Sequence, residues 1–224
     1  MSLSFDVFWS FRSPYSYLVT KRLVRLVEEW DVTAVIRPVR PLAVRTPDHF
    51  VRMDPLWRPY LFLDTKRTAD YLGLPFARPR PDPIIQDPQT NVIAAEQPYI
   101  QNLTHLGIAA CRMGRGLAYI DHVGSMLWDG TVVGWDQGDH LARAAAAAGL
   151  DHDRLQAMVD DDRDGCEAEL QANEAALRAA GHWGVPTFVF EGEPFFGQDH
   201  LDVLLWRLRR HGTARRSSGE AVDG

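Results

Sequence analysis

The chain has 224 residues and a mass of 25.3 kDa, enough for a substantial core, because a chain of this size buries about 70% of its surface on folding. Its content of 46% hydrophobic, 10% aromatic and 24% charged residues argues against disordered, collagen-like and coiled-coil proteins. The net charge of −6 at pH 7 has the wrong sign for binding nucleic-acid phosphates. No apolar run is long enough to cross a bilayer and the first residues lack the features of a secretory signal, so we expect a cytoplasmic protein with no nucleic-acid or membrane partner.

The first forty residues predict a β-α-β unit. Residues 3–11 form a nearly continuous apolar and aromatic run, which is typical of a strand buried on both faces. Apolar residues then recur at helical spacing from Leu18 to Trp30 with charged residues between them, and a β-rich stretch follows at 32–36. The two strands should be parallel, with a right-handed crossover through the helix.

The middle of the chain favours helices, and strand patterns disappear there. Residues 74–88 are rich in proline and predict an extended surface connection rather than an element. The helices that we expect cover 58–72, a long segment of 89–114 kinked at Pro98, 117–128, an Ala-rich helix capped by Asp136 and ending at Gly149, and 164–180.

Strand patterns return after Gly181, with runs at 187–190 and 194–196 and a closing helix from about Gln198. The element order is that of an α/β fold, a thioredoxin-like domain with an inserted all-helical subdomain. We therefore expect a discontinuous thioredoxin-like domain of residues 1–45 and 182–212, a helical insertion of residues 46–181, and a flexible tail of residues 213–224.

Ser13-Pro14-Tyr15-Ser16 lies where the first strand passes into the first helix. Serine is a preferred N-cap and proline a preferred first helical residue, so the motif by itself describes a well-built helix start. A helix N-terminus at the carboxyl edge of a parallel sheet also favours anions. Thioredoxin-like redox proteins carry Cys-x-x-Cys at this place, and here hydroxyls replace both sulfurs. We therefore expect a ligand to supply the sulfur, with Ser13 as the donor to its thiolate.

Two later motifs offer partners for the rest of such a ligand. Pro186 in Gly184-Val185-Pro186-Thr187 can simply open a strand, or a cis Val185–Pro186 bond can turn the Val185 backbone toward Ser13 to pair with an extended peptide. Gln198 and Asp199 begin the last helix, where an acidic residue is ordinary. Alternatively they hold the carboxylate and the ammonium of an amino-acid head group. Glutathione has all of these parts.

Other reactive residues predict no site of their own. Cys111 and Cys166 have no Cys-x-x-Cys spacing, which favours buried, unreactive thiols over a disulfide framework or metal knuckle. The eight histidines are scattered without metal-ligand spacing. We expect no metal site.

Three motifs together resemble the 2-hydroxychromene-2-carboxylate isomerase family, relatives of the kappa-class glutathione transferases in the DsbA-like thioredoxin superfamily. The motifs are Phe11-Arg12-Ser13-Pro14-Tyr15-Ser16-Tyr17-Leu18, Gly184-Val185-Pro186-Thr187-Phe188 and Phe195-Phe196-Gly197-Gln198-Asp199. The resemblance implies a homodimer with glutathione as cofactor. Ser13 would then address the sulfur, Val185 before a cis Pro186 the cysteinyl backbone, and Gln198 with Asp199 the γ-glutamyl end.

The resemblance implies a glutathione-dependent isomerase acting on an aromatic or conjugated small molecule, in which a thiolate adds reversibly so that a double bond can rotate. The alternatives are a kappa-like glutathione transferase and a non-catalytic thioredoxin-like binding module. The missing cysteines argue against a thiol oxidoreductase.

Two further residues each have two interpretations, and one segment departs from the pattern of the family. Asn173 matches a polar position of the family that is linked to glutathione, or lies on a helix surface. Trp183 lines a pocket for a flat substrate or packs in the core. The segment 40–45 lacks the glycines, lysine and asparagine of the family, so the partner of the glycine carboxylate of glutathione stays open.

Overall fold

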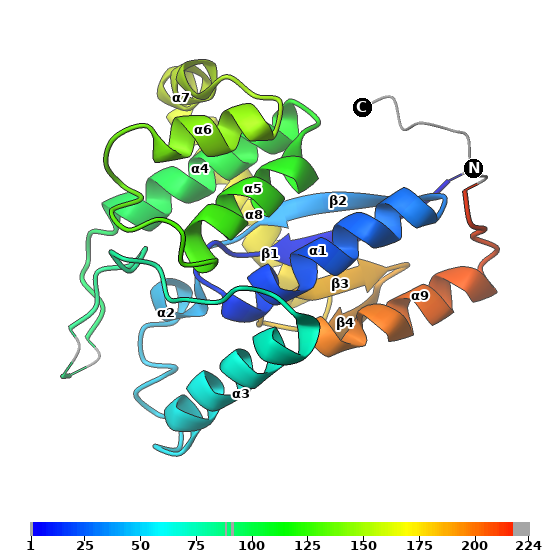
Figure 1. Ribbon diagram of the computed structural model, residues 1–224, viewed down its shortest axis with the longest axis horizontal. Helices are drawn as coiled ribbons and strands as arrows, with labels where there is room; N and C mark the ends of the chain where they lie inside the picture. Colours follow the sequence, from blue (N-terminus) through cyan, green and yellow to red (C-terminus); the bar gives the residue numbers. More distant parts are fainter. Residues whose placement is uncertain (1, 88, 91, 217–224) are drawn as a thin grey trace.

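A four-stranded sheet forms the centre of the fold in the computed structural model, which describes residues 2–87, 89–90 and 92–216 (Figure 1). The strand order is β2-β1-β3-β4. β1 (Leu3–Trp9) and β2 (Val32–Pro38) are parallel and joined by α1 (Pro14–Glu29), while β3 (Thr187–Phe190) and β4 (Glu193–Phe196) continue the sheet in antiparallel pairs. The expected α/β thioredoxin-like architecture is confirmed.

Helices occupy the long middle part of the chain and its end. In Figure 1 the helices α4 to α7 gather beside one end of the sheet, α8 passes behind the sheet, and α3 and α9 lie below β3 and β4. Their bounds are α2 (Leu42–Arg45), α3 (Trp57–Leu72), α4 (Pro98–Arg112), α5 (Gly116–Trp128), α6 (His140–Ala147), α7 (His152–Asp161), α8 (Arg163–Ala179), a 3₁₀ turn η1 (Gln198–His200) and α9 (Leu201–Arg210).

Several helix boundaries differ from the predicted ones. Pro98 begins α4 rather than kinking a longer helix, because the first helical position needs no backbone N–H. Asp136 does not cap the Ala-rich helix, which begins later, after Asp139. The pattern did not predict α7, whose start is fixed by the Asp151 carboxylate, which accepts a hydrogen bond from the Arg154 backbone N–H at 2.8 Å.

The buried core joins the helical block to the sheet just before Ser13. Phe11 is fully buried, and its ring meets Trp9 at 4.8 Å and Tyr119 of α5 at 6.2 Å, both edge to face. The Trp128 indole N–H donates to the Phe11 carbonyl at 2.9 Å. The predicted division into a thioredoxin-like domain and a helical insertion stays a prediction, since one core contains residues of both parts.

The first residues of the predicted flexible tail contact Trp30 and the end of α1. The Arg216 backbone N–H donates to the Glu29 carbonyl at 2.8 Å. The backbones of Arg215 and Trp30 form an isolated antiparallel β-bridge. The guanidinium groups of Arg209 and Arg215 lie about 5.5 Å from the Trp30 ring centre, in cation–π contact. Flexibility of residues 213–224 therefore stays a prediction, and residues 217–224 lie outside the described part of the chain.

Among the helices that the structure describes, none combines the length and the apolar character that a membrane crossing requires.

We predict that Phe11→Ala lowers the free energy of unfolding by about 3–5 kcal/mol, because it removes a buried aromatic side chain and leaves a cavity. Urea unfolding followed by circular dichroism measures the shift in midpoint. Tyr71→Ala is the control, because Tyr71 is 87% exposed and its loss should change stability by less than about 0.5 kcal/mol. Equal losses in the two variants would contradict the assignment of Phe11 to the junction.

Candidate functional site

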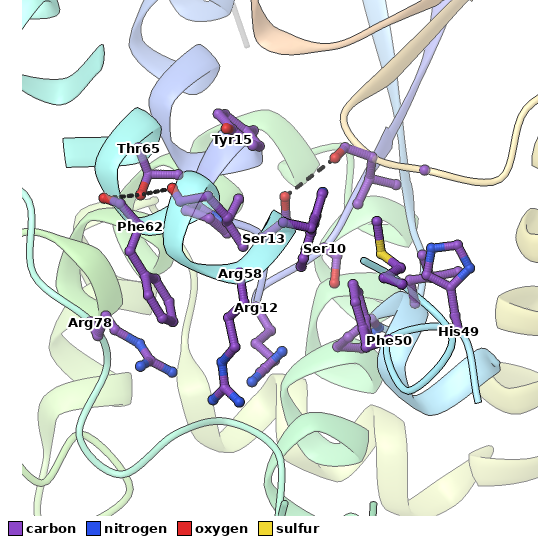
Figure 2. Close-up of a pocket in the computed structure, with 18 of the residues that line it drawn as sticks. Ser10, Arg12, Ser13, Tyr15, His49, Phe50, Arg58, Phe62, Thr65 and Arg78 are labelled. Carbon is purple, nitrogen blue, oxygen red and sulfur yellow. Dashed lines mark hydrogen bonds between the residues drawn. The ribbon is translucent and has the colours of Figure 1, made fainter. Parts of the chain in front are cut away.

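A cavity of about 1000 Å³ opens beside the N-terminus of α1 (Figure 2). Most of its wall comes from four places far apart in the sequence: the start of α1, the segment of residues 49–66 that includes the first half of α3, the proline-rich connection, and the turn before β3. The wall is completed by Pro41, Leu42, Thr90, Trp128 and Phe196. Residues 74–87 form neither a helix nor one of the strands β1 to β4, as predicted. They also form one wall of this cavity.

Ser13 lies at the rim of this cavity and uses its hydroxyl in two directions. The Oγ atom accepts the Ser16 backbone N–H at 3.2 Å, which makes Ser13 the N-cap of α1. It also donates to the Val185 carbonyl at 3.4 Å, a long hydrogen bond drawn in Figure 2. A hydroxyl has one hydrogen and two lone pairs. The cap uses a lone pair, so the hydrogen can be given to a ligand without loss of the cap.

The Val185–Pro186 peptide bond is cis, the alternative that the motif left open. The Val185 carbonyl faces Ser13 as expected, but it is paired with the Ser13 hydroxyl rather than free. Gly184 has no room for a side chain, since a Cβ atom there would lie 2.5 Å from the Phe196 ring. The Gly197 backbone N–H donates to the Pro186 carbonyl at 2.9 Å. The second and third motifs are therefore neighbours in the fold.

Gln198 and Asp199 lie at the start of η1, outside the residues that line the cavity. The backbone carbonyl of Gln198 accepts from Arg22 of α1 at 2.7 Å, and its side-chain oxygen accepts from the same guanidinium group. The Asp199 side chain is 69% exposed. Both residues follow directly on Gly197 and the cis-proline turn, but the structure does not bring them into the cavity with Ser13.

Trp183 lies in the cavity wall and is 41% exposed. Its ring stacks on His182 at 5.2 Å and meets His49 at 4.7 Å. The His182 Nδ1 atom accepts the Gly184 backbone N–H at 2.9 Å, and burial lowers the pKa of His182. The His182 imidazole is therefore neutral at pH 7, and Trp183, which lines the cavity, offers a flat aromatic surface to it.

Asn173 is almost fully buried on α8 and does not line the cavity. Its amide donates to the Pro38 carbonyl at 3.2 Å and accepts from Arg37, so it fastens the end of β2 rather than lying on a helix surface. The segment 40–45 likewise forms structural contacts. Arg40 makes a two-point ion pair with Glu174, and Arg45 donates to the Trp183 carbonyl at 2.9 Å.

Tyr15 and Asp64 join α1 to α3 at the cavity wall. The Tyr15 hydroxyl donates to the Asp64 carboxylate at 2.5 Å, and burial together with this bond raises the pKa of Tyr15. Burial opposes ionisation of Asp64, but hydrogen bonds from Tyr15 and Arg67 outweigh it and lower the pKa of that carboxyl. The pair therefore stays as phenol and carboxylate at pH 7 and holds α3 in place.

The cysteines are not part of this site. Burial raises the pKa of Cys111 to about 12 and also raises that of Cys166. Neither residue lines the cavity. Within the residues that the structure describes, no group of histidine, cysteine and acidic side chains is arranged to hold a metal ion.

Sequence reasoning missed several polar residues of the cavity. Ser10 is 1% exposed, and its hydroxyl has no hydrogen-bond partner in the described chain. Arg12, Arg58 and Arg78 bring guanidinium groups to the same space (Figure 2). The adjacency of Ser10 and Arg12 to Ser13 was a signal that could have identified them, whereas nothing in the local pattern marks the other two arginines.

Comparisons with solved structures show the same fold at low sequence identity. A 2-hydroxychromene-2-carboxylate isomerase is 20% identical with a TM-score of 0.68, over 93% of this chain and 96% of that one. A probable DsbA oxidoreductase from Streptomyces coelicolor is 18% identical with a TM-score of 0.64, over 99% and 94%. The cytosolic disulfide reductase DsbM from Pseudomonas aeruginosa, solved with GSH, is 18% identical with a TM-score of 0.61, over 92% and 100%.

A comparison with curated proteins found no match. The family model described as a DSBA-like thioredoxin domain matches residues 5–209, nearly the whole length of the sequence. The match includes the Ser13 motif, the cis-proline turn and the helices between them. The chain therefore belongs to the family of DSBA-like thioredoxin domains.

Proposed function

We propose that this protein is a glutathione-dependent isomerase of the 2-hydroxychromene-2-carboxylate type, acting on an aromatic or conjugated small molecule. The single observation that carries the proposal is the hydroxyl of Ser13, held at the rim of a large cavity in the place where redox relatives carry a reactive thiol. The described cavity wall contains no cysteine, so the sulfur has to come with a ligand.

The residues of the site fit glutathione on three grounds. Ser13 can turn its hydroxyl hydrogen from the Val185 carbonyl, 3.4 Å away, to a thiolate. The Ser10 hydroxyl is buried in the cavity wall without a partner, and an unpaired buried polar group favours a ligand that pairs with it. The described wall also carries more cationic than anionic side chains, as an anionic peptide requires.

When bound, glutathione would supply a thiolate that adds reversibly to a conjugated double bond. Ser13 would hold that sulfur by a charge-assisted hydrogen bond, stronger than a neutral one. The start of α1 adds the positive end of a helix dipole. Val185 offers its carbonyl, and Trp183 with its neighbouring rings offers a flat surface along which an aromatic substrate can lie.

The two alternatives differ from the isomerase in the step after binding. A kappa-like glutathione transferase would leave the substrate attached to the sulfur, while a binding module would turn over no electrophile. The cis-to-trans change of a chromene substrate, measured by ultraviolet absorbance, distinguishes the three. The isomerase forms the trans product without consuming glutathione, and the transferase consumes one equivalent of glutathione. The binding module forms no product and consumes no glutathione. The expected homodimer and cytoplasmic location stay predictions.

We predict that glutathione binds and raises the melting temperature of the protein at millimolar concentration, because a ligand that binds only the folded state stabilises it. Isothermal titration calorimetry provides the affinity. S-methylglutathione is the matched control, since it lacks the thiol, and it should bind less tightly. Absence of both binding heat and thermal protection would remove the basis of the proposal.

We predict that Ser13→Ala raises the pKa of the bound thiol by about 1–2 units, because a hydrogen bond to a charged group contributes about 1.5–3 kcal/mol. The thiolate is the form that loses its donor, so its ultraviolet absorbance should appear at higher pH than in the wild type. Ser13→Gly removes the same hydroxyl while keeping most of the helix cap, and it should give the same shift.

Ser16→Ala is the control for this titration. The Ser16 side chain is buried, its hydroxyl has no partner in the described chain, and it does not line the cavity. Its removal should leave the pKa of the bound thiol unchanged. A shift in Ser16→Ala without one in the Ser13 variants would move the sulfur to the other end of the motif.

We predict that Cys111→Ala with Cys166→Ala retains isomerase activity, because neither thiol lines the cavity. In the native wild-type protein both thiols should react slowly with a disulfide reagent at pH 7, since burial raises both pKa values. Labelling should become fast on unfolding in urea. Reduction of insulin by the wild type that is lost in the double variant would instead favour a thiol oxidoreductase.

A further inference from the structure

The cavity is positively charged although the protein is negatively charged. Its described wall carries Arg12, Arg58, Lys66 and Arg78 against only Asp54 and Asp82, while the whole chain has a net charge of −6. Figure 2 shows the guanidinium groups of Arg12, Arg58 and Arg78 reaching toward the same region below Ser13. Positive charge is therefore concentrated where a ligand would lie.

Asp82 is shared by two of these arginines. Its carboxylate takes two hydrogen bonds from Arg12, at 2.8 and 2.9 Å, and its Oδ2 atom lies 3.5 Å from Arg78. Burial lowers the pKa of Arg78, and repulsion from Arg12 and Arg58 lowers it further, against the attraction of Asp82. One carboxylate thus pairs with two arginines that repel each other, and an additional anion would lower this repulsion.

The surroundings of the arginines select the kind of anion. The Phe62 ring is in cation–π contact with two of them, since its centre lies 5.8 Å from the Arg58 guanidinium carbon and 4.9 Å from that of Arg78. Guanidinium groups in a fixed plane recognise carboxylates by paired hydrogen bonds. The apolar part of the wall, which includes Phe50, Trp57 and Phe76, suits a carbon skeleton attached to that carboxylate.

We propose that Arg12, Arg58 and Arg78 form a carboxylate-binding subsite of this cavity, with Asp82 as the internal group that limits its strength. Arg12 directly precedes Ser13, so their Cα atoms are about 3.8 Å apart and the subsite adjoins the proposed sulfur position. Its place in catalysis rests on the proposed function. The carboxylate comes from one of two sources, the acid group of the aromatic substrate or the glycine end of glutathione.

The first experiment uses chromone-2-carboxylate and chromone-2-carboxamide as probes, with no glutathione present. Quenching of tryptophan fluorescence reports binding, because Trp57, Trp128 and Trp183 line the cavity. The acid should bind the wild type at least about tenfold more tightly than the amide, since only the acid forms charge-assisted hydrogen bonds. This preference should fall as the salt concentration rises.

Two variants should change this preference in opposite directions. Arg78→Gln should reduce it by about tenfold or to nothing, because a cation of the subsite is lost. Asp82→Asn should increase it, because Arg12 and Arg78 lose their internal counter-charge while the asparagine oxygen can still accept the Ile84 backbone N–H that Asp82 now accepts. Misfolding would weaken binding of the acid in both variants. Opposite changes in the preference for the acid over the amide therefore distinguish a binding role of these residues from a structural one.

Arg52→Gln is the matched control for loss of one positive charge. The Arg52 side chain is 80% exposed, pairs with Asp48 and does not line the cavity. It should leave the preference for the acid unchanged. An equal effect of Arg52→Gln and Arg78→Gln would mean that the net charge of the molecule is responsible, and would overturn the subsite.

The second experiment distinguishes the two sources by comparing glutathione with its glycine ethyl ester in the same variants. If Arg78→Gln and Asp82→Asn change the preference for the chromone acid over its amide, the subsite binds the carboxylate of the substrate. A loss of the preference for glutathione over its ester in Arg78→Gln assigns it to the glycine end. If neither preference depends on Arg78 and Asp82, the inference is wrong.

The failure of this inference is distinguishable from the failure of the proposed function. A protein that prefers the chromone acid through Arg78 but binds no glutathione keeps the subsite and loses the proposed isomerase. A protein that binds glutathione without any dependence on Arg78 keeps the proposed function and loses the subsite.

Discussion

The hydroxyl group of Ser13 is the point on which the proposed chemistry depends. Its lone pair caps α1 by accepting the Ser16 backbone N–H, and its hydrogen is directed at the Val185 carbonyl over 3.4 Å. A cysteine at this place would be a nucleophile in its own right, whereas a serine hydroxyl donates a hydrogen bond and stays unionised at pH 7. In the proposed function, the same backbone arrangement that activates a thiol in redox relatives would stabilise the thiolate of another molecule.

The surrounding fold keeps that hydroxyl in position from two sides. On one side Phe11 packs between Trp9 and Tyr119, and its carbonyl accepts the Trp128 indole N–H, which fixes the chain entering α1. On the other side the cis-proline turn brings the Val185 carbonyl to Ser13, in a space where Gly184 cannot be replaced without a clash. The helical block therefore supports the site through the core as well as supplying cavity walls.

The cavity combines two environments that act on different parts of a ligand. Near Trp183 the wall is aromatic, and the His182 ring stacks on Trp183 from outside the wall. Near Arg12, Arg58 and Arg78 the wall is cationic and only partly neutralised by Asp82. A flat conjugated molecule with an acidic end matches this division.

The sequence by itself determined the order of the strands and of most helices, the helix start at Ser13 and the absence of a reactive thiol from its motif, because caps, prolines and hydrophobic periodicity act over a few residues. It also marked Pro186 as a residue that could be cis, without deciding between the isomers. Tertiary structure decided what depends on contacts between distant segments. The proline-rich connection carries Arg78 and Asp82 to a cavity that begins at Ser13, Asn173 turns inward to fasten β2, and Gln198 pairs with Arg22. No local pattern contains these outcomes, because the partner of each residue lies more than sixty positions away and only packing brings the two together.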